Sequence, residues 1–444
     1  MAQTAPAVEQ RLAVLEAAAR SDLSARDNAW VLTGAAFVLM MTGPGLVLFY
    51  GGLVRKKNVL NTMMQTFVLM ALMSVLWVVV GYSLAFADGA SVVGGLQHAF
   101  LKGVGAAPNP DYAATIPAQT FMAFQMMFGL FATTMICGAF AERMKFSALL
   151  LFMPLWMLMV YCPIVHMVWG RGGLLNEALG GPVRCLDFAG GVVVHITAGV
   201  SALVCSLYLG KRFGYPSESM KPHSLVLSVA GAGVLWVGWL TLNAGRALGD
   251  AALAGSAFIA TQLGAAGGTL GWMTAEWRGT RKLSALGAIS GAVSGLIGIT
   301  AASGFVQPMA ALLIGFTTAL VCHYMVVAVK MRFGYDDTLD VFGLHGAGGT
   351  IGALLTGVFA TNLVNSSWKD AAGRPVALGW VDGNAGQVGS QLASCGIAWV
   401  LAIAGTWAAL KICDVLVGLR VSQEQEIQGL DSALHGQEGY GWEP

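Results

Sequence analysis

Charged side chains are scarce in this sequence: they make up 11% of its 444 residues, whereas a soluble domain averages about 25%. Hydrophobic residues account for 56% of the chain, and the formal net charge is only +1. This near balance of charge gives no support for nucleic-acid binding. Together these deficits exclude an ordinary soluble domain and indicate an integral membrane protein.

Paired cysteines and enzyme motifs are also missing. The seven cysteines lie mostly inside apolar stretches and have no paired spacing, so neither a disulfide framework nor a metal site is predicted. The sequence also lacks a glycine-rich phosphate loop, a metal-ligand cluster and a nucleophile constellation. We therefore expect no cofactor and no enzymatic activity.

What the chain does contain is a series of apolar stretches, each long enough to approach or exceed the roughly 20 residues of a membrane-spanning helix. Eleven are predicted, over residues 29–52, 58–87, 118–141, 146–168, 188–209, 224–245, 253–275, 282–302, 304–330, 337–361 and 386–418. The ten-residue alternating segments of a membrane barrel are absent. We expect an all-α integral membrane domain over residues 29–418, between an N-terminal segment (1–28) and a tail (419–444).

Basic residues concentrate in alternate connections, which predicts that those connections are cytoplasmic. The cytoplasmic set comprises Arg55, Lys56, Lys57, Arg143, Lys145, Lys211, Arg212, Lys221, Arg278, Arg281, Lys282, Lys330, Arg332, Lys411 and Arg420. An odd number of spans then places the N-terminus outside and the C-terminus inside a plasma (inner) membrane.

The N-terminal segment raises two expectations. Its first residues, MAQTAPAVEQ, lack a signal-peptide pattern, although an outside N-terminus normally needs one, which suggests a processed or engineered start. The heptad-like spacing of Val8, Leu12, Leu15 and Ala19 favours a short external helix that packs on the bundle or on a neighbouring subunit.

Two of the histidines inside predicted spans belong to similar, glycine-rich segments. His195 belongs to DFAGGVVVHITAG (187–199) and His345 to DVFGLHGAGGTIG (340–352). An ionisable group in a span suggests a functional site, although a histidine bonded to a neighbouring helix is the plainer alternative. The two segments occupy the fifth and tenth spans, as expected for an inverted repeat with a site near the midplane. Two neutral imidazoles there could bind a small nitrogen base and relay a proton.

An aspartate precedes each histidine. Asp187, at the external start of its span, can accept hydrogen bonds from free backbone N–H groups and complement the helix dipole. By the same reasoning, Asp340 is expected to play this structural role on the cytoplasmic side. Asp187 should also make the external mouth more attractive to cations.

Several longer stretches resemble the ammonium transporter (Amt/MEP/Rh) family, in the right order from about residue 30 to 440. They are PGLVLFYGGLVRKKNVL (44–60), FQMMF (124–128), GAFAERMKFSA (138–148), HMVWG (166–170), DFAGGVVVH (187–195), GWLTLNAG (238–245), DVFGLHG (340–346), and VGLRV with GLDSALHG (417–436). The resemblance implies two inverted five-helix halves plus a final helix, a homotrimer with one pore per subunit, and selective uptake of ammonium.

The resemblance also implies roles for individual residues. Trp169 and Phe124 would form an external aromatic cage, Phe128 part of a hydrophobic gate, and His195 and His345 the pore lining. Aromatic residues at an interface are more often membrane anchors, but a desolvated cation over an indole gains on the order of 2 kcal/mol, so we favour the cage for Trp169. Ammonium would be recruited there, deprotonated and conducted as ammonia, with the histidines relaying the proton, which excludes potassium.

Two positions depart from the family pattern. Leu242 stands where a second gate phenylalanine is expected, and Arg246 where a serine would bond the recruited ammonium. An arginine about 5 Å from a bound cation costs roughly 3 kcal/mol, on the order of a hundredfold in affinity. Arg246 could instead lie over Trp169 and fill the cation site itself, or turn outward and pair with Asp250 or Glu177.

These departures leave a non-conducting or weakly conducting ammonium receptor as the main alternative to a transporter, and a channel for another small neutral molecule as a further one. Some relatives carry signalling domains after the last span, and the stretch after Gly436 is too short for one unless it was removed. The resemblance further implies that residues 419–444 pack on the cytoplasmic face and help to dock a PII-type signal protein.

Overall fold

The computed structural model describes residues 5–370 and 372–440, and within them the chain forms helices and loops, with isolated bridges but no β-strand. The α-helices are α1 (Ala5–Met40), α2 (Leu46–Leu53), α3 (Val59–Leu76), α4 (Tyr82–Phe86), α5 (Ala118–Phe140), α6 (Phe146–Trp156), α7 (Cys162–Trp169), α8 (Thr197–Leu209), α9 (Leu225–Gly245), α10 (Ala251–Thr280), α11 (Ala285–Thr300), α12 (Pro308–Tyr324), α13 (Lys330–Phe333), α14 (Ala347–Phe359), α15 (Gly386–Val417), α16 (Gln423–Gln428) and α17 (Leu430–His435).

Nine helical stretches among the described residues are long and apolar enough to cross a membrane. They are Arg20–Leu53, Lys56–Phe86, Ala118–Phe140, Phe146–Trp169, Gly191–Leu209, Leu225–Gly245, Pro308–Phe333, Phe342–Phe359 and Gly386–Val417. The other two predicted spans, 253–275 and 282–302, coincide with α10 and with α11, a shorter apolar helix. The chain is therefore a multi-pass helical membrane protein.

The bundle encloses two helices that begin within it. The π-helical segment η7 (Gly191–Ile196) continues into α8, and η9 (Phe342–Gly346) continues into α14. α8 packs against α5, α15 and η9, while α14 packs against η7, α11 and α12. Residues of one helix thereby reach the start of the other, in the interior of the bundle.

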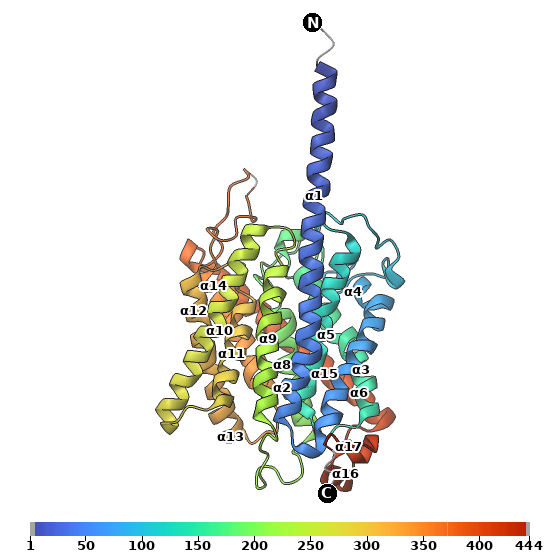
Figure 1. Ribbon diagram of the computed structural model, residues 1–444, viewed down its shortest axis with the longest axis vertical. Helices are drawn as coiled ribbons and strands as arrows, with labels where there is room; N and C mark the ends of the chain where they lie inside the picture. Colours follow the sequence, from blue (N-terminus) through green and yellow to red (C-terminus); the bar gives the residue numbers. More distant parts are fainter. Residues whose placement is uncertain (1–4, 371, 441–444) are drawn as a thin grey trace.

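The first helix extends well beyond the bundle at one end (Figure 1). α1 has 36 residues, about 54 Å at 1.5 Å per residue, and no break separates residues 5–28 of the predicted N-terminal segment from the first span. Leu12 and Leu15 are exposed, so neither packs on the bundle within this chain. The side chains of Val8 and Ala19 lie outside the described part of the structure.

The C-terminal tail packs at the opposite end of the bundle (Figure 1). Arg420 bonds Glu426 at 2.8 Å and the carbonyl of Leu209 at 2.9 Å. The carboxylate of Asp431 accepts hydrogen bonds from the backbone N–H groups of Leu60 (3.0 Å) and Asn61 (2.8 Å), in the first turn of α3. The tail is thus an ordered part of the molecule as far as residue 440.

Candidate functional site

His195 and His345 meet where the two interior helices approach each other. Their Nδ1 atoms are 3.2 Å apart, and their rings stack with centroids 5.2 Å apart and planes inclined by 27°. Both side chains are almost fully buried, with exposed fractions of 1% and 5%. A hydrogen bond between two ring nitrogens needs one donor and one acceptor, so two neutral imidazoles in different tautomers satisfy this contact.

Glycine makes this approach possible. A Cβ atom on Gly199 would lie 2.0 Å from the backbone nitrogen of Gly346, and a Cβ atom on Gly349 would lie 2.9 Å from the carbonyl oxygen of Gly191. Small residues let helix backbones come into contact in a membrane. The glycines that flank both histidines therefore fix the spacing between the two rings.

Aromatic side chains wall in the histidine pair. Trp239 of α9 stacks on His195 with ring centroids 5.2 Å apart, and Phe131 of α5 meets His195 edge-on at 6.3 Å. The Trp239 indole is oriented by a 2.8 Å hydrogen bond that its Nε1–H donates to Thr300. Among the described residues, neither histidine has an ion-pair partner.

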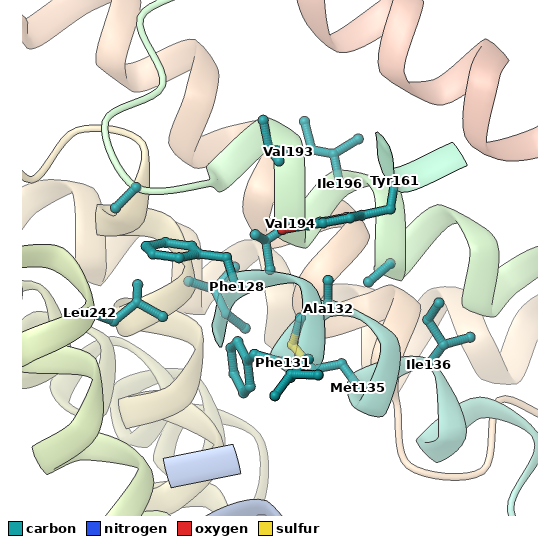
Figure 2. Close-up of a cluster of buried hydrophobic side chains, with 14 of the residues drawn as sticks. Phe128, Phe131, Ala132, Met135, Ile136, Tyr161, Val193, Val194, Ile196 and Leu242 are labelled. Carbon is teal, nitrogen blue, oxygen red and sulfur yellow. The ribbon is translucent and has the colours of Figure 1, made fainter. Parts of the chain in front are cut away.

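The predicted gate residues are buried in the same apolar cluster. Phe128 is fully buried and Leu242 is 2% exposed. Figure 2 shows both side chains in one part of this cluster, with Phe131 close by and Val194 of η7 beside them. Leu242 therefore fills the core beside Phe128 even though it is not aromatic.

A ladder of aromatic rings runs from the N-terminal half of α5 to α7. Phe124 meets Phe128 edge-on at 5.2 Å, and Phe128 meets Trp169 of α7 edge-on at 5.7 Å. Trp169 is fixed by a 2.9 Å hydrogen bond that its Nε1–H donates to the Asp187 carbonyl. Trp169 lines an open cavity of about 340 Å³ together with Tyr112, Asn176, Asp187, Phe188, Arg246 and Trp368. Phe124, the other predicted cage residue, is fully buried and is not among the residues that line this cavity.

Arg246 lies over the indole of Trp169. Its guanidinium carbon is 4.7 Å from the ring centroid, and burial lowers the pKa of Arg246 to about 10, so that the group remains a cation at neutral pH. The outward pairing with Asp250 or Glu177 is wrong: Asp250 accepts a hydrogen bond from Leu253 at the start of α10, and Glu177 pairs with Arg184. The position over Trp169 is the alternative that the structure adopts.

The chain is similar to known proteins over most of its length. A sequence profile described as "Ammonium Transporter Family" matches residues 29–440. The ammonium transporter of Bacillus subtilis is 45% identical over 414 residues, which cover 93% of this chain and 98% of the relative. The chain belongs to the ammonium transporter family. Family membership supports ammonium transport as the general function of this protein, and a membrane as its location.

Solved structures place the fold in the same family. The crystal structure of Saccharomyces cerevisiae Mep2 matches with a TM-score of 0.81 and 34% identity, covering 89% of this chain and 90% of that one. A structure titled "Sensor Amt Protein" matches with a TM-score of 0.81 and 25% identity, covering 92% of this chain and 98% of that one. Transporters and a sensor therefore share this fold.

The aspartates before the two interior helices require a correction to the sequence reading. Asp187 accepts four hydrogen bonds, from the N–H groups of residues 190, 191, 192 and 193, at 2.7–2.9 Å. On the other helix, the prediction for Asp340 is wrong, because its carboxylate pairs with Lys330 at 2.5 Å. Asp337 caps that helix, accepting a 2.7 Å hydrogen bond from Phe342 N–H.

The sequence held a signal for this cap that was missed. Asp187 lies eight residues before His195, and Asp337 lies eight residues before His345, whereas Asp340 lies only five before it. Asp187 lies four residues before the start of η7 and Asp337 five residues before the start of η9, so each carboxylate can reach the first N–H groups of its helix. Trp239, Phe131 and Thr300 were missed as well, and they carried no such signal because apolar and hydroxyl residues are common throughout the spans.

Proposed function

We propose that this protein carries ammonium across the membrane by releasing its proton on the external side and passing ammonia along the buried histidine pair. The observation that carries the proposal is the 3.2 Å contact between the Nδ1 atoms of His195 and His345. This contact lies in an aromatic, apolar interior, whose hydrophobic core includes Phe128 and Leu242.

The apolar interior accounts for selectivity against potassium. A bare monovalent cation among Phe128, Leu242 and Trp239 would lose its hydration without a charged partner, which is costly. Ammonium can avoid this cost by dissociating into ammonia and a proton. Potassium has no proton to release, so the same interior excludes it.

The histidine pair supplies a route for the released proton. Because one Nδ1 donates to the other, an incoming proton at one ring allows a proton on the opposite ring to leave, after which the tautomers exchange. Ammonia passes the rings as a neutral solute that can donate and accept hydrogen bonds. The proton and the ammonia then recombine to ammonium on the cytoplasmic side, so that charge and atoms balance.

The proposal includes the remaining architecture. Residues 29–418 form eleven spans in two inverted five-helix halves plus a final helix, with the N-terminal segment outside and the 419–444 tail inside a plasma (inner) membrane. Support comes from the equal spacing of Asp187 and Asp337 from their histidines and from the opposite ends at which α1 and the tail lie (Figure 1). By family likeness, the chain assembles as a homotrimer and docks a PII-type signal protein at the tail.

An ammonium receptor is the second candidate function. The observation that favours it is Arg246, whose guanidinium covers the Trp169 ring at 4.7 Å. A solved structure titled as a sensor has the same fold. A receptor would bind ammonium at the mouth without carrying it past the histidine pair.

The deciding experiment uses purified protein in proteoliposomes on a solid-supported membrane. Ammonium pulses should give a current that decays faster at higher protein density, and potassium pulses should give none. The variant with His195→Ala and His345→Ala should lose the ammonium current or admit potassium. His98→Ala, in the external connection before α5, should behave as wild type. Ammonium currents unchanged in the double variant would overturn the proposed mechanism, and a silent wild-type protein that still binds ammonium would favour the receptor.

A further inference from the structure

Arg246 is held in place from two sides. It directly follows the last residue of α9, and its backbone N–H bonds the carbonyl of Asn243 at 3.2 Å. The end of α9 in turn rests on the aromatic ladder, because a Cβ atom on Gly245 would lie 2.9 Å from the ring of Phe124. A cation at the C-terminus of a helix is stabilised by the helix dipole. The end of α9 therefore positions this guanidinium at the cavity that Trp169 lines.

No carboxylate of the described residues forms an ion pair with the guanidinium, although the charge of Asp187 favours its cationic form. The Nε of Arg246 is buried without a hydrogen-bond partner among those residues. The acids around the cavity are already engaged: Glu177 with Arg184, Asp111 with Arg171, and Asp187 with four backbone N–H groups. The face of Trp169 is the main favourable contact left to this cation.

The indole itself cannot move away from the guanidinium. Its Nε1–H is tied to the Asp187 carbonyl at 2.9 Å, and the ring of Phe128 meets it edge-on at 5.7 Å. Trp169 lines the cavity, where its ring face would attract a small entering cation. That place is taken by a side chain of the same protein.

We propose that Arg246 is a tethered occupant of the external cation site, which ammonium must displace or bypass. This inference rests on the proposed function, since it concerns the entry step of the same pathway. The protein then works with low apparent affinity for ammonium, and Trp169 contributes to that affinity only when Arg246 is removed. Arg246, rather than the histidine pair, sets the concentration range in which the protein responds.

Arg246 lowers the affinity for ammonium in two ways, because it occupies the ring face and because its charge repels a second cation. A second cation cannot share the ring face with the guanidinium, and two unit charges about 5 Å apart at an effective dielectric constant near 20 repel by an amount equal to about a hundredfold in affinity. Replacing Arg246 by serine, a short neutral hydroxyl residue, should therefore lower the half-saturating ammonium concentration by about ten- to a hundredfold.

A double-mutant cycle tests the inference. It compares wild type, Arg246→Ser, Trp169→Leu and the double variant, with Arg374→Ser as an exposed external arginine control. The first readout is half-saturation of ammonium transport in proteoliposomes, and the second is calorimetric binding of methylammonium to detergent-solubilised protein. Trp169→Leu should change half-saturation by less than about twofold in wild type, but weaken it by at least about tenfold in the Arg246→Ser protein.

Each outcome is decisive. An equal effect of Trp169→Leu in both backgrounds, or unchanged affinity in Arg246→Ser, would overturn the inference while leaving ammonium transport intact. If none of the proteins transports ammonium, the proposed function fails, and methylammonium binding still decides about Arg246. Binding that appears only in Arg246→Ser and is lost in the double variant would support the tethered occupant without any transport.

Discussion

The two interior helices carry paired histidines, but they begin in different surroundings. At the start of η7, both carboxylate oxygens of Asp187 accept hydrogen bonds from four backbone N–H groups. At the other helix, Asp337 caps through one oxygen, while its Oδ1 is buried without a hydrogen-bond partner. The Lys330–Asp340 ion pair lies beside it, and the Lys330 ammonium also donates to the Asp337 carbonyl at 2.6 Å.

This difference in hydrogen bonding separates a rigid half of the site, around η7 and Asp187, from a half around η9 and Asp337 that we expect to titrate. A carboxylate saturated by backbone donors holds one geometry: burial raises the pKa of Asp187, but its four N–H donors oppose that rise. A buried carboxylate with a free oxygen favours its protonated form, and burial raises the pKa of Asp337 to about 6, an effect that Lys330 counteracts. We therefore expect the external half to depend on packing and hydrogen bonding, and the other half to respond to pH.

The largest loss of stability is expected where α8 contacts η9. Gly199→Ala places a methyl group 2.0 Å from the Gly346 backbone nitrogen, which cannot move as a flexible side chain would. The substitution should destabilise the protein by about 3 kcal/mol or more and separate the two histidines. The measurement is thermal unfolding in detergent together with ammonium current. Gly233→Ala is the matched control, because a Cβ atom there meets nothing within 4 Å, and equal melting of the two variants would contradict the prediction.

The next largest loss of stability should come from removing the Asp187 cap of η7. Asp187→Ala leaves four buried N–H groups, those of Gly190 and the first three residues of η7, without their acceptor, at about 1–3 kcal/mol for each that stays unsatisfied. We expect a loss of at least about 3 kcal/mol in the free energy of unfolding. Asp250→Ala removes an exposed cap that accepts one hydrogen bond, from Leu253, and should cost only about 1 kcal/mol. A smaller loss for Asp187→Ala than for Asp250→Ala would show that the external half is not held by this cap.

A smaller, pH-dependent effect is expected at the other cap. Because the pKa of Asp337 is raised to about 6 in the folded protein, the folded state binds this proton more tightly than the unfolded chain does. The stabilisation from the proton is therefore present below about pH 4 and is lost as the pH rises to about 6, by about 2–3 kcal/mol in total. Asp337→Asn should remove this component, so the stability difference between wild type and variant changes across that window. A difference independent of pH would refute the titration of Asp337.

The contrast between the caps also marks what the sequence could reveal. The family motifs, the span positions and the pairing of His195 with His345 follow from patterns printed in the chain. The role of Asp340 was misread because nearness to the motif was favoured over the eight-residue spacing that Asp337 shares with Asp187. For Arg246 the sequence left two orientations open, since its choice depends on which acids already have partners in the folded protein.

The smallest expected effect tests how Lys330 acts on the titration of Asp337, at the start of η9. Lys330 lowers the pKa of Asp337, so Lys330→Met should move the midpoint of the pH-dependent component above pH 6, because the carboxylate loses its nearest positive charge. The same pH series of thermal unfolding measures this midpoint, relative to the matching Asp337→Asn background in which it is absent. Lys221→Met, an exposed lysine in the connection before α9, should leave the midpoint where it is. A midpoint that stays at pH 6 or falls in Lys330→Met would mean that the Lys330–Asp340 ion pair is electrically separate from the cap, and the two halves would then differ only in their hydrogen bonds.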